Sequence, residues 1–184
     1  MRQSERALVL LLAPPAIVLP AAAAHAVQYL DVSQAQRALF ADATRFEPAP
    51  VTLNDDQRRA IEKSSATRTP IPTERIWRAL DGDRLLGHVI VDEVYGKHEF
   101  ITYAVAIDPS GAVLGLEIMD YRETHGGEIR QAEWRAQFRG KRAGDALELG
   151  DGIANISGAT MSCKHVTDGV KRLLALHALA LAGR

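Results

Sequence analysis

Residues Phe100–Ile107 read FITYAVAI, in which large apolar side chains alternate with small or polar ones. The turn sequence DPSG follows, and a second apolar run extends from Val113 to Met119. A period of two is typical of a strand with one face in a core, and a short turn joins antiparallel neighbours. The stretch therefore predicts an antiparallel strand pair. Its core-facing residues are expected to be Ile101, Tyr103, Val105 and Ile107 in the first strand and Leu114, Leu116 and Ile118 in the second.

Two further strands are expected before this pair. Ile76–Leu80 and Leu85–Val94 are apolar runs that flank Asp81-Gly82-Asp83, which is a tight hairpin signal. Consecutive strands joined by short turns form an antiparallel meander, whereas parallel strands need long crossover connections. The four runs together therefore predict one antiparallel sheet.

The segment before the sheet, residues 27–72, is expected to be a helical lead-in packed on the domain that comes after it. Val32–Ala43 carries apolar residues at helical spacing, and the stretch from Thr52 to about Ser64 opens with short polar residues and then acids. Phe46–Val51 lies between them and contains two prolines, so it is predicted to be a loop.

Two more helices are predicted after the strands. Glu128–Arg139 is a short helix that Gly140 stops, and Ser162–Ala182 is a long one whose apolar residues recur every three or four positions. The fold class is therefore α+β: an antiparallel β-meander sheet covered by helices, with a helical N-terminal lead-in and a long C-terminal helix. The buried stripe of that last helix is expected to contain Val166, Val170, Leu173, Leu174, His177 and Leu181.

The N-terminus has the layout of a secretory signal peptide. Arg2 and Arg6 precede an apolar run, Ala7–Ala24, and Ala24–Ala26 (AHA) fits a small-x-small cleavage site. The run contains three prolines, which oppose a membrane-spanning helix. Residues 1–26 are therefore predicted to be removed, leaving a periplasmic or otherwise exported, soluble protein. The alternative is an uncleaved N-terminus that anchors the chain in a membrane.

Composition excludes several classes of function. The net charge is −1 and no basic tract is present, so we expect no nucleic-acid partner. Cys163 is the only cysteine, which rules out an intramolecular disulfide and a c-type haem attachment, and we expect it to be buried and inert. His88 and His98 lack recurring metal-ligand spacing. No nucleophile elbow or phosphate loop occurs either, so no catalytic residue or metal ligand is assigned.

Ile156–Ser162 reads ISGATMS and leads directly into the predicted C-terminal helix. Small residues let the backbone approach a ligand closely, and a helix N-terminus offers free N–H groups and a positive dipole end. This pattern is typical of an anion site. The alternative interpretation is structural, with Ser157 capping the helix and Gly158 easing the turn.

The string Ser157–Thr160 (SGAT) resembles the attachment motif of the FMN-binding domain family, whose members include the covalently flavinylated subunits of the sodium-translocating NADH:quinone reductase and the Rnf complex. The resemblance covers roughly residues 84–182. Family members place a segment with Glu-Thr and glycines before a helix with a Trp and a closing Phe-x-Gly. Here Tyr121–Glu128 reads YRETHGGE, and the helix after it supplies Trp134, Phe138 and Gly140.

Many members of the family also carry an Asp shortly before the Ser of the motif. This chain has Ala154 and Asn155 at the nearest positions, and Asp151 lies further upstream. Whether these residues permit flavinylation stays open on the sequence alone.

The resemblance implies a set of cofactor-binding residues. In the family, FMN is joined through its phosphate to the hydroxyl of the motif's last Thr or Ser, which here is Thr160. Lys164 is expected either to pair with the phosphate or to be solvated, and Met161 or Leu116 to supply an apolar face. Glycine N–H groups would meet the ring edge. The full expected set is Ser157, Gly158, Ala159, Thr160, Met161, Lys164, Glu123, Thr124, His125, Gly126 and Gly127.

The function that the resemblance implies is electron transfer by an exported flavoprotein, with residues 73–184 as its FMN-binding domain. It would carry FMN covalently, exchange electrons with a membrane redox partner, and depend on a separate flavin transferase for maturation. The alternative is a periplasmic binding or assembly module that holds FMN non-covalently or not at all. A docking role of the lead-in for a membrane subunit is compatible with either.

Overall fold

The computed structural model describes residues 27–65 and 70–183. The predicted signal peptide, residues 1–26, lies outside the described residues, so its cleavage stays a prediction. The division of the remaining chain at residue 72 likewise stays a prediction.

The fold centres on a six-stranded sheet in which every neighbouring pair is antiparallel, with the strand order β1-β6-β5-β4-β3-β2. The predicted meander is confirmed as β3 to β6, four strands consecutive in the chain and adjacent in the sheet. The strands are β1 (Val27–Gln28), β2 (Arg45–Pro48), β3 (Ile76–Asp81), β4 (Arg84–Tyr95), β5 (Phe100–Ile107) and β6 (Val113–Tyr121).

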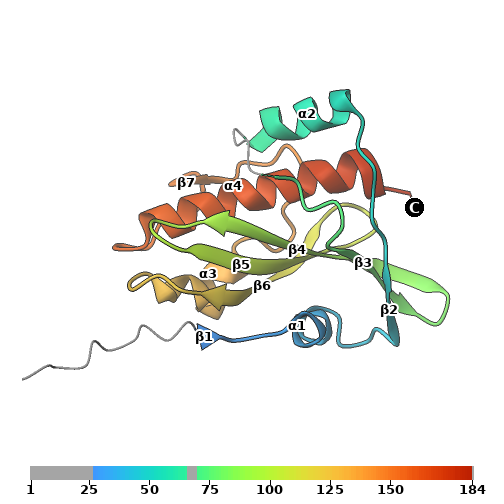
Figure 1. Ribbon diagram of the computed structural model, residues 1–184, viewed down its shortest axis with the longest axis horizontal. Helices are drawn as coiled ribbons and strands as arrows, with labels where there is room; N and C mark the ends of the chain where they lie inside the picture. Colours follow the sequence, from blue (N-terminus) through green and yellow to red (C-terminus); the bar gives the residue numbers. More distant parts are fainter. Residues whose placement is uncertain (1–26, 66–69, 184) are drawn as a thin grey trace, which may run out of the picture.

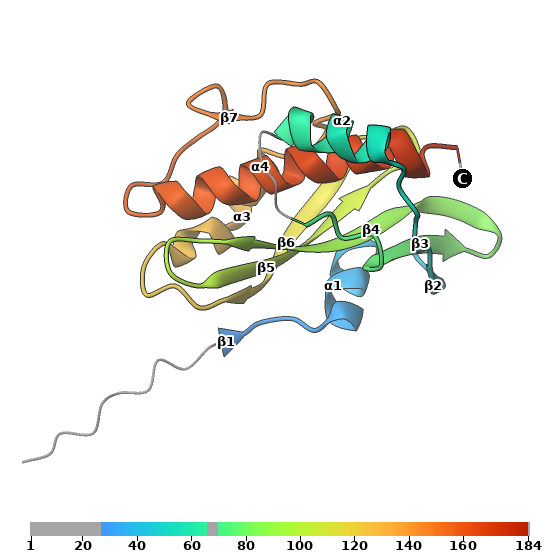
Figure 2. The same cartoon turned by 45° about the horizontal axis from the view of Figure 1, so that its top comes forward.

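Helices cover both faces of the sheet. Figure 1 shows α2 (Asp55–Ser65) and α4 (Thr160–Leu176) on one side and α1 (Val32–Leu39) on the other, and Figure 2 shows the same layering. α4 continues into the π-helical turn η2 (His177–Leu181). This arrangement confirms the α+β class, the helices of the lead-in and the long C-terminal helix. All six residues predicted for the buried stripe of the last helix are buried.

The alternation predicted for β5 is confirmed. Ile101, Tyr103, Val105 and Ile107 belong to the core beneath α4, and Ala104 and Ala106 to the core beneath α1. In β6 the prediction for Leu114 is wrong, because Leu114 is 37% exposed. The pairing register shifts there, with Ile107 opposite Val113 and Ala106 opposite Gly115. Leu114 is thus the extra residue of a bulge, and a bulge turns one side chain away from its expected face.

The lead-in does more than supply helices. β2 replaces part of the loop predicted over Phe46–Val51 and pairs with β3, while β1 pairs with β6. These short strands form the two edges of the sheet. Pro48 ends β2, where an edge strand tolerates a residue without an N–H donor.

The segment predicted as one helix over Glu128–Arg139 is divided. It forms the 3-10 helix η1 (Gly127–Arg130) and the short helix α3 (Ala132–Ala136), and Gly140 follows with φ 79°. Two very short strands that the sequence did not predict, β7 (Glu148–Leu149) and β8 (Gly152–Ile153), precede α4.

A buried polar cluster fixes α4 on the sheet. Arg172 of α4 donates from Nη2 to Oδ2 of Asp92 on β4 at 2.5 Å, and the Tyr103 hydroxyl of β5 donates to the same oxygen. Arg172 and Tyr103 are fully buried and Asp92 is 2% exposed. A Cβ at Gly169 would overlap the Tyr103 hydroxyl, so glycine is needed where the helix crosses this tyrosine.

We predict that Asp92→Ala lowers the free energy of unfolding by about 3–5 kcal/mol, because it leaves the Arg172 guanidinium buried without a counter-charge. Urea unfolding followed by circular dichroism measures the loss. The double variant Asp92→Ala/Arg172→Met, which removes the stranded charge, is expected to be more stable than Asp92→Ala alone. A loss below about 1 kcal/mol in Asp92→Ala would contradict this account of the cluster.

Two buried histidines meet between β4 and the end of α4. The rings of His88 and His177 lie 5.2 Å apart, and His88 Nδ1 and His177 Nε2 have no hydrogen-bond partner among the described residues. Burial, with lesser contributions from His177 and Arg78, lowers the pKa of His88 from 6.5 to about 4. Burial also lowers the pKa of His177. Both rings are therefore neutral in the folded protein at neutral pH.

We predict that the protein loses stability as the pH falls from 6.5 towards 4, because the unfolded chain binds the His88 proton more tightly than the folded protein does. Above that window the stability from this group is fully present. The loss reaches about 2 kcal/mol near about pH 5, measured as the free energy of urea unfolding across the pH range. The variant His88→Leu is expected to show a much weaker dependence over the same range. An unchanged slope in that variant would refute the assignment to His88.

Candidate functional site

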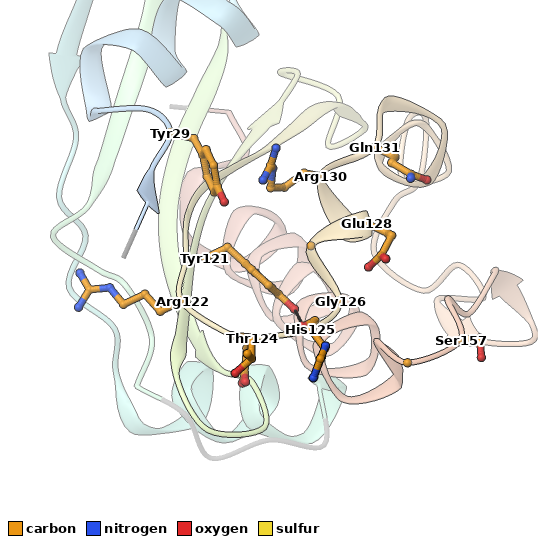
Figure 3. A pocket seen from close by; sticks show the side chains of 13 residues that line it. Tyr29, Tyr121, Arg122, Thr124, His125, Gly126, Glu128, Arg130, Gln131 and Ser157 are labelled. Atoms are coloured by element: carbon orange, nitrogen blue, oxygen red, sulfur yellow. Dashed lines mark hydrogen bonds between the residues drawn. The ribbon is translucent and has the colours of Figure 1, made fainter. Parts of the chain in front are cut away.

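A cavity of about 1070 Å³ opens between the end of β6, η1 and the loop before α4. In the view of Figure 3, Tyr29 and Arg130 lie at its upper side, Thr124 and His125 at its lower side, and Ser157 at its right. Its lining consists of Tyr29, Tyr121, Arg122, Glu123, Thr124, His125, Gly126, Gly127, Glu128, Arg130, Gln131, Ser157 and Gly158.

A second cavity of about 470 Å³ adjoins the first at the N-terminus of α4. The two share Glu123, Thr124, His125 and Gly158 in their walls. The smaller cavity is further lined by Lys97, His98, Ala159, Thr160, Met161 and Ser162. The glycine-rich segment after β6 and the SGAT motif, which are far apart in the sequence, thus contribute residues to the walls of both cavities.

The structure brings together ten of the eleven residues predicted to bind the cofactor, since each lines one or both cavities. The exception is Lys164, which lines neither and places its Nζ 2.6 Å from Asp168 Oδ2, one turn further along α4. Leu116, the alternative for an apolar face, also lines neither and is buried in the core under α4.

Glu123 holds the β4–β5 hairpin loop against the site. Its Oε1 accepts hydrogen bonds from the backbone N–H groups of Lys97, His98 at 2.7 Å and Glu99 at 3.1 Å. Burial raises the pKa of this carboxyl, but the three N–H donors outweigh it and hold the pKa below its usual value. Glu123 therefore fixes the loop that carries Lys97 and His98 beside the smaller cavity.

Two side chains of the α3 region hold the loop that leads to the motif. The Trp134 indole N–H donates to the Ala154 carbonyl at 2.8 Å, and Gln137 Oε1 accepts from the Ala154 N–H at 2.7 Å. Trp134 is 4% exposed and stacks edge-on against Phe138 with ring centroids 5.1 Å apart. Trp134 thus packs in the core beneath α4, and its indole N–H orients the backbone ahead of the motif.

The N-terminus of α4 is open. The cap residue is Ala159, which has no side-chain acceptor, and the first turn carries no acidic residue. The capping role considered for Ser157 is therefore wrong. The first N–H groups of a helix have no partner within it, and the dipole makes this end positive. An anion in the smaller cavity would face these groups.

The hydroxyls of the motif differ in their availability. Thr160 is exposed, and its Oγ1 accepts a hydrogen bond from Asn155 Nδ2 at 3.0 Å. Ser162 is buried, and its Oγ lies 3.1 Å from the Tyr121 hydroxyl. Ser157 is exposed but lines the larger cavity. Cys163 is fully buried, and burial raises the pKa of its thiol, in agreement with the inert role expected for it.

Bare glycine backbone borders the space that a ligand would fill. A Cβ added at Gly127 or Gly158 would meet no atom within 4 Å, so neither residue is packed against protein. The Thr124 hydroxyl and the His125 ring supply hydrogen-bond donors and acceptors in the same walls. A cavity of this size, lined by glycine backbone and polar side chains and adjoined by a second cavity at an open helix end, has the room and the hydrogen-bonding groups for a phosphate-bearing ring ligand such as FMN.

Sequence reasoning missed six residues of the larger cavity: Tyr29, Tyr121, Arg122, Glu128, Arg130 and Gln131. Tyr29 reaches the site because β1 pairs with β6, a contact that leaves no periodic signal in a two-residue strand. Arg130 and Gln131 lie where the predicted helix is interrupted, between η1 and α3. The sequence signal that could have indicated Arg130 and Gln131 is the pair Gly126-Gly127 shortly before them.

We predict that Gly126→Ala destabilises the fold by about 1–3 kcal/mol, because the site depends on a close approach there. Gly126 has φ 88°, and a Cβ would lie 2.6 Å from the Tyr121 hydroxyl and 2.8 Å from Ala159 Cβ. The matched control is Gly127→Ala, which meets no neighbour and should unfold close to wild type. Thermal and urea unfolding of the two variants give the comparison. Equal stability of the pair would contradict the contact between this loop and the motif.

The described part of the chain contains no group of three or more His, Cys, Asp or Glu residues placed to hold a metal ion. None of its helices combines the length and apolarity that crossing a membrane requires.

Comparison with known proteins finds a matching family, a similar protein and a similar solved structure. Residues 96–175 match the family described as FMN-binding domain. Over 130 residues the chain is 28% identical to a subunit of the proton-translocating ferredoxin:NAD(+) oxidoreductase complex of Clostridium ljungdahlii, covering 66% of this chain and 70% of that protein. The crystal structure of NqrC from Shewanella oneidensis shares the fold, with a TM-score of 0.51 at 19% identity over 73% of this chain and 80% of NqrC. The matched region contains the Tyr121–Glu128 segment, the SGAT motif and most of α4. It is this part of the chain that matches the FMN-binding domain family.

Proposed function

We propose that this protein carries FMN as a phosphate ester on Thr160 and works as an exported electron-transfer protein. The observation that carries the proposal is the position of Thr160. Its exposed hydroxyl stands at the uncapped N-terminus of α4, in the wall of a cavity that adjoins a second one large enough for the flavin ring system.

Backbone groups, rather than a lysine, would hold the phosphate. The open N–H groups of the first turn of α4 face the smaller cavity, and a helix N-terminus favours an anion by about 0.3–1 kcal/mol, rising to about 2 when partly buried. Lys164 would have to leave Asp168 to take part. Because the dipole contribution is modest, retention of the cofactor rests on the ester bond. Asn155, donating to Thr160 Oγ1, would orient the acceptor oxygen.

The larger cavity would take the ring system. The bare backbone of Gly127 and Gly158 admits a flat group without obstruction, and Thr124 and His125 lie in both walls, where the polar chain between phosphate and ring would pass. Bound flavin supplies reversible electron transfer, which none of the side chains in this site provides alone. The residues of this chain bind, orient and partly enclose it.

The relatives support a place for this redox work. The similar protein of Clostridium ljungdahlii is a subunit of an oxidoreductase complex, and the present chain has no dinucleotide-binding fingerprint of its own. We therefore propose a membrane redox partner as electron donor or acceptor, with the signal peptide predicted at residues 1–26 directing export. Esterification would require a separate flavin transferase.

A second function follows from one departure in the motif. Ala154 and Asn155 stand where many family members have an Asp. The resemblance implies that a flavin transferase recognises this region. If flavinylation does not occur, the same cavities would hold FMN non-covalently or serve a binding or assembly module of this fold.

The decisive experiment uses the exported protein produced together with a flavin transferase. Intact mass and in-gel flavin fluorescence of the denatured protein should show a gain equal to FMN less one water in wild type and in Thr160→Ser. Thr160→Ala should lose both signals. Ser157→Ala, which removes the other exposed hydroxyl of the motif, is the matched control and should stay modified.

Two results would reject covalent attachment at Thr160. One is modification that persists in Thr160→Ala. The other is unmodified wild type while a standard family member in the same host becomes flavinylated. In the latter case, quenching of free FMN fluorescence by the purified protein distinguishes a non-covalent holder from a module without flavin.

A further inference from the structure

An aromatic–cation pair forms one wall of the larger cavity. The Arg130 guanidinium carbon lies 3.9 Å from the centroid of the Tyr29 ring, and both side chains line the cavity (Figure 3). Contacts at this distance are within the range of a cation–π interaction. Arg130 comes from η1, whereas Tyr29 comes from the lead-in.

The lead-in places Tyr29 firmly. Its backbone N–H donates to the Met119 carbonyl of β6 at 2.9 Å, directly after the β1–β6 pairing, and its partly buried ring packs against the core under α4. Tyr29 lies outside residues 96–175, which match the FMN-binding domain. The wall is therefore completed by a segment that the family match does not include.

Arg130 stands out among the charged residues of this cavity. Arg122 is paired with Asp120 at 2.8 Å, and the Glu123 carboxylate accepts three backbone N–H groups. Within residues 27–65 and 70–183, no carboxylate lies within ion-pair distance of Arg130, and this includes the exposed Glu128 of the same cavity. Arg130 thus offers an unneutralised positive charge at the cavity wall, held in place by an aromatic ring.

We propose that the Tyr29–Arg130 pair is part of the flavin site and raises the reduction potential of the bound flavin. The inference rests on the proposed function. Reduction adds negative charge to the ring system, and a fixed guanidinium beside it favours the reduced form, more strongly in a partly enclosed cavity than in water. Tyr29 acts as a positioning residue, because its ring holds the guanidinium at the wall.

The test is redox titration of the flavin-loaded protein, with flavin content measured by intact mass in every variant. Arg130→Gln is expected to lower the equilibrium constant for flavin reduction about tenfold. For a two-electron couple, this makes the reduction potential about 30 mV more negative. Arg130→Lys, which keeps the charge but not the planar stacking, should shift less. Tyr29→Leu should shift in the same direction as Arg130→Gln. Arg58→Gln, an equal charge change on an exposed residue of α2 that lines neither cavity, is the matched control and should match wild type.

The outcomes separate the two claims. Full flavin content with the same potential in Arg130→Gln and Arg58→Gln would overturn this inference and leave the proposed function standing. Wild type without flavin would overturn the proposed function and the inference together. Should Arg130→Gln fail to fold, an unshifted potential in Tyr29→Leu would overturn the inference on its own.

Discussion

The shared hydrogen bonds of Asp92 are the constraint on which the rest of the structure depends. One carboxylate oxygen receives both Arg172 from α4 and Tyr103 from β5, so the helix and the sheet meet at one buried point. A buried charge without partners is strongly unfavourable, which leaves α4 little freedom to slide or rotate. The first turn of that helix carries the SGAT motif. Its direction across the sheet therefore decides where Thr160 stands relative to the loops at the ends of β4 and β6.

Those loops contact the motif so closely that a larger side chain would not fit. Gly126 touches Ala159 and Tyr121, and Glu123 gathers the N–H groups of the β4–β5 hairpin. The segments that line the cavities are thus held in place by contacts with other parts of the protein. Cavity walls that are already held in place make a preorganised binding site. Little conformational entropy is then lost when a ligand binds.

The parts of the fold that rest on local periodicity were predictable. The alternation in β5 and the apolar stripe of α4 predict which side chains are buried. The glycine-rich segment and the SGAT motif indicate an anion site. Elements fixed by pairing were not: Leu114 turns outward at a bulge, and β1 and β2 gain their place only from neighbouring strands. Tyr29 was missed for that reason. The ion pair of Lys164 with Asp168 could have been predicted from the sequence, because residues four apart on a helix lie close enough for opposite charges to pair.

The central claim is that the two adjoining cavities form one site, with the phosphate at the start of α4 and the ring against the wall of Tyr29 and Arg130. A crystal structure of the flavin-loaded protein tests it most directly. The account predicts electron density that runs without a break from Thr160 Oγ1 through the smaller cavity to a ring in the larger one. An ester on another residue, or a ring held outside the cavity between Gly127 and Tyr29, would contradict it.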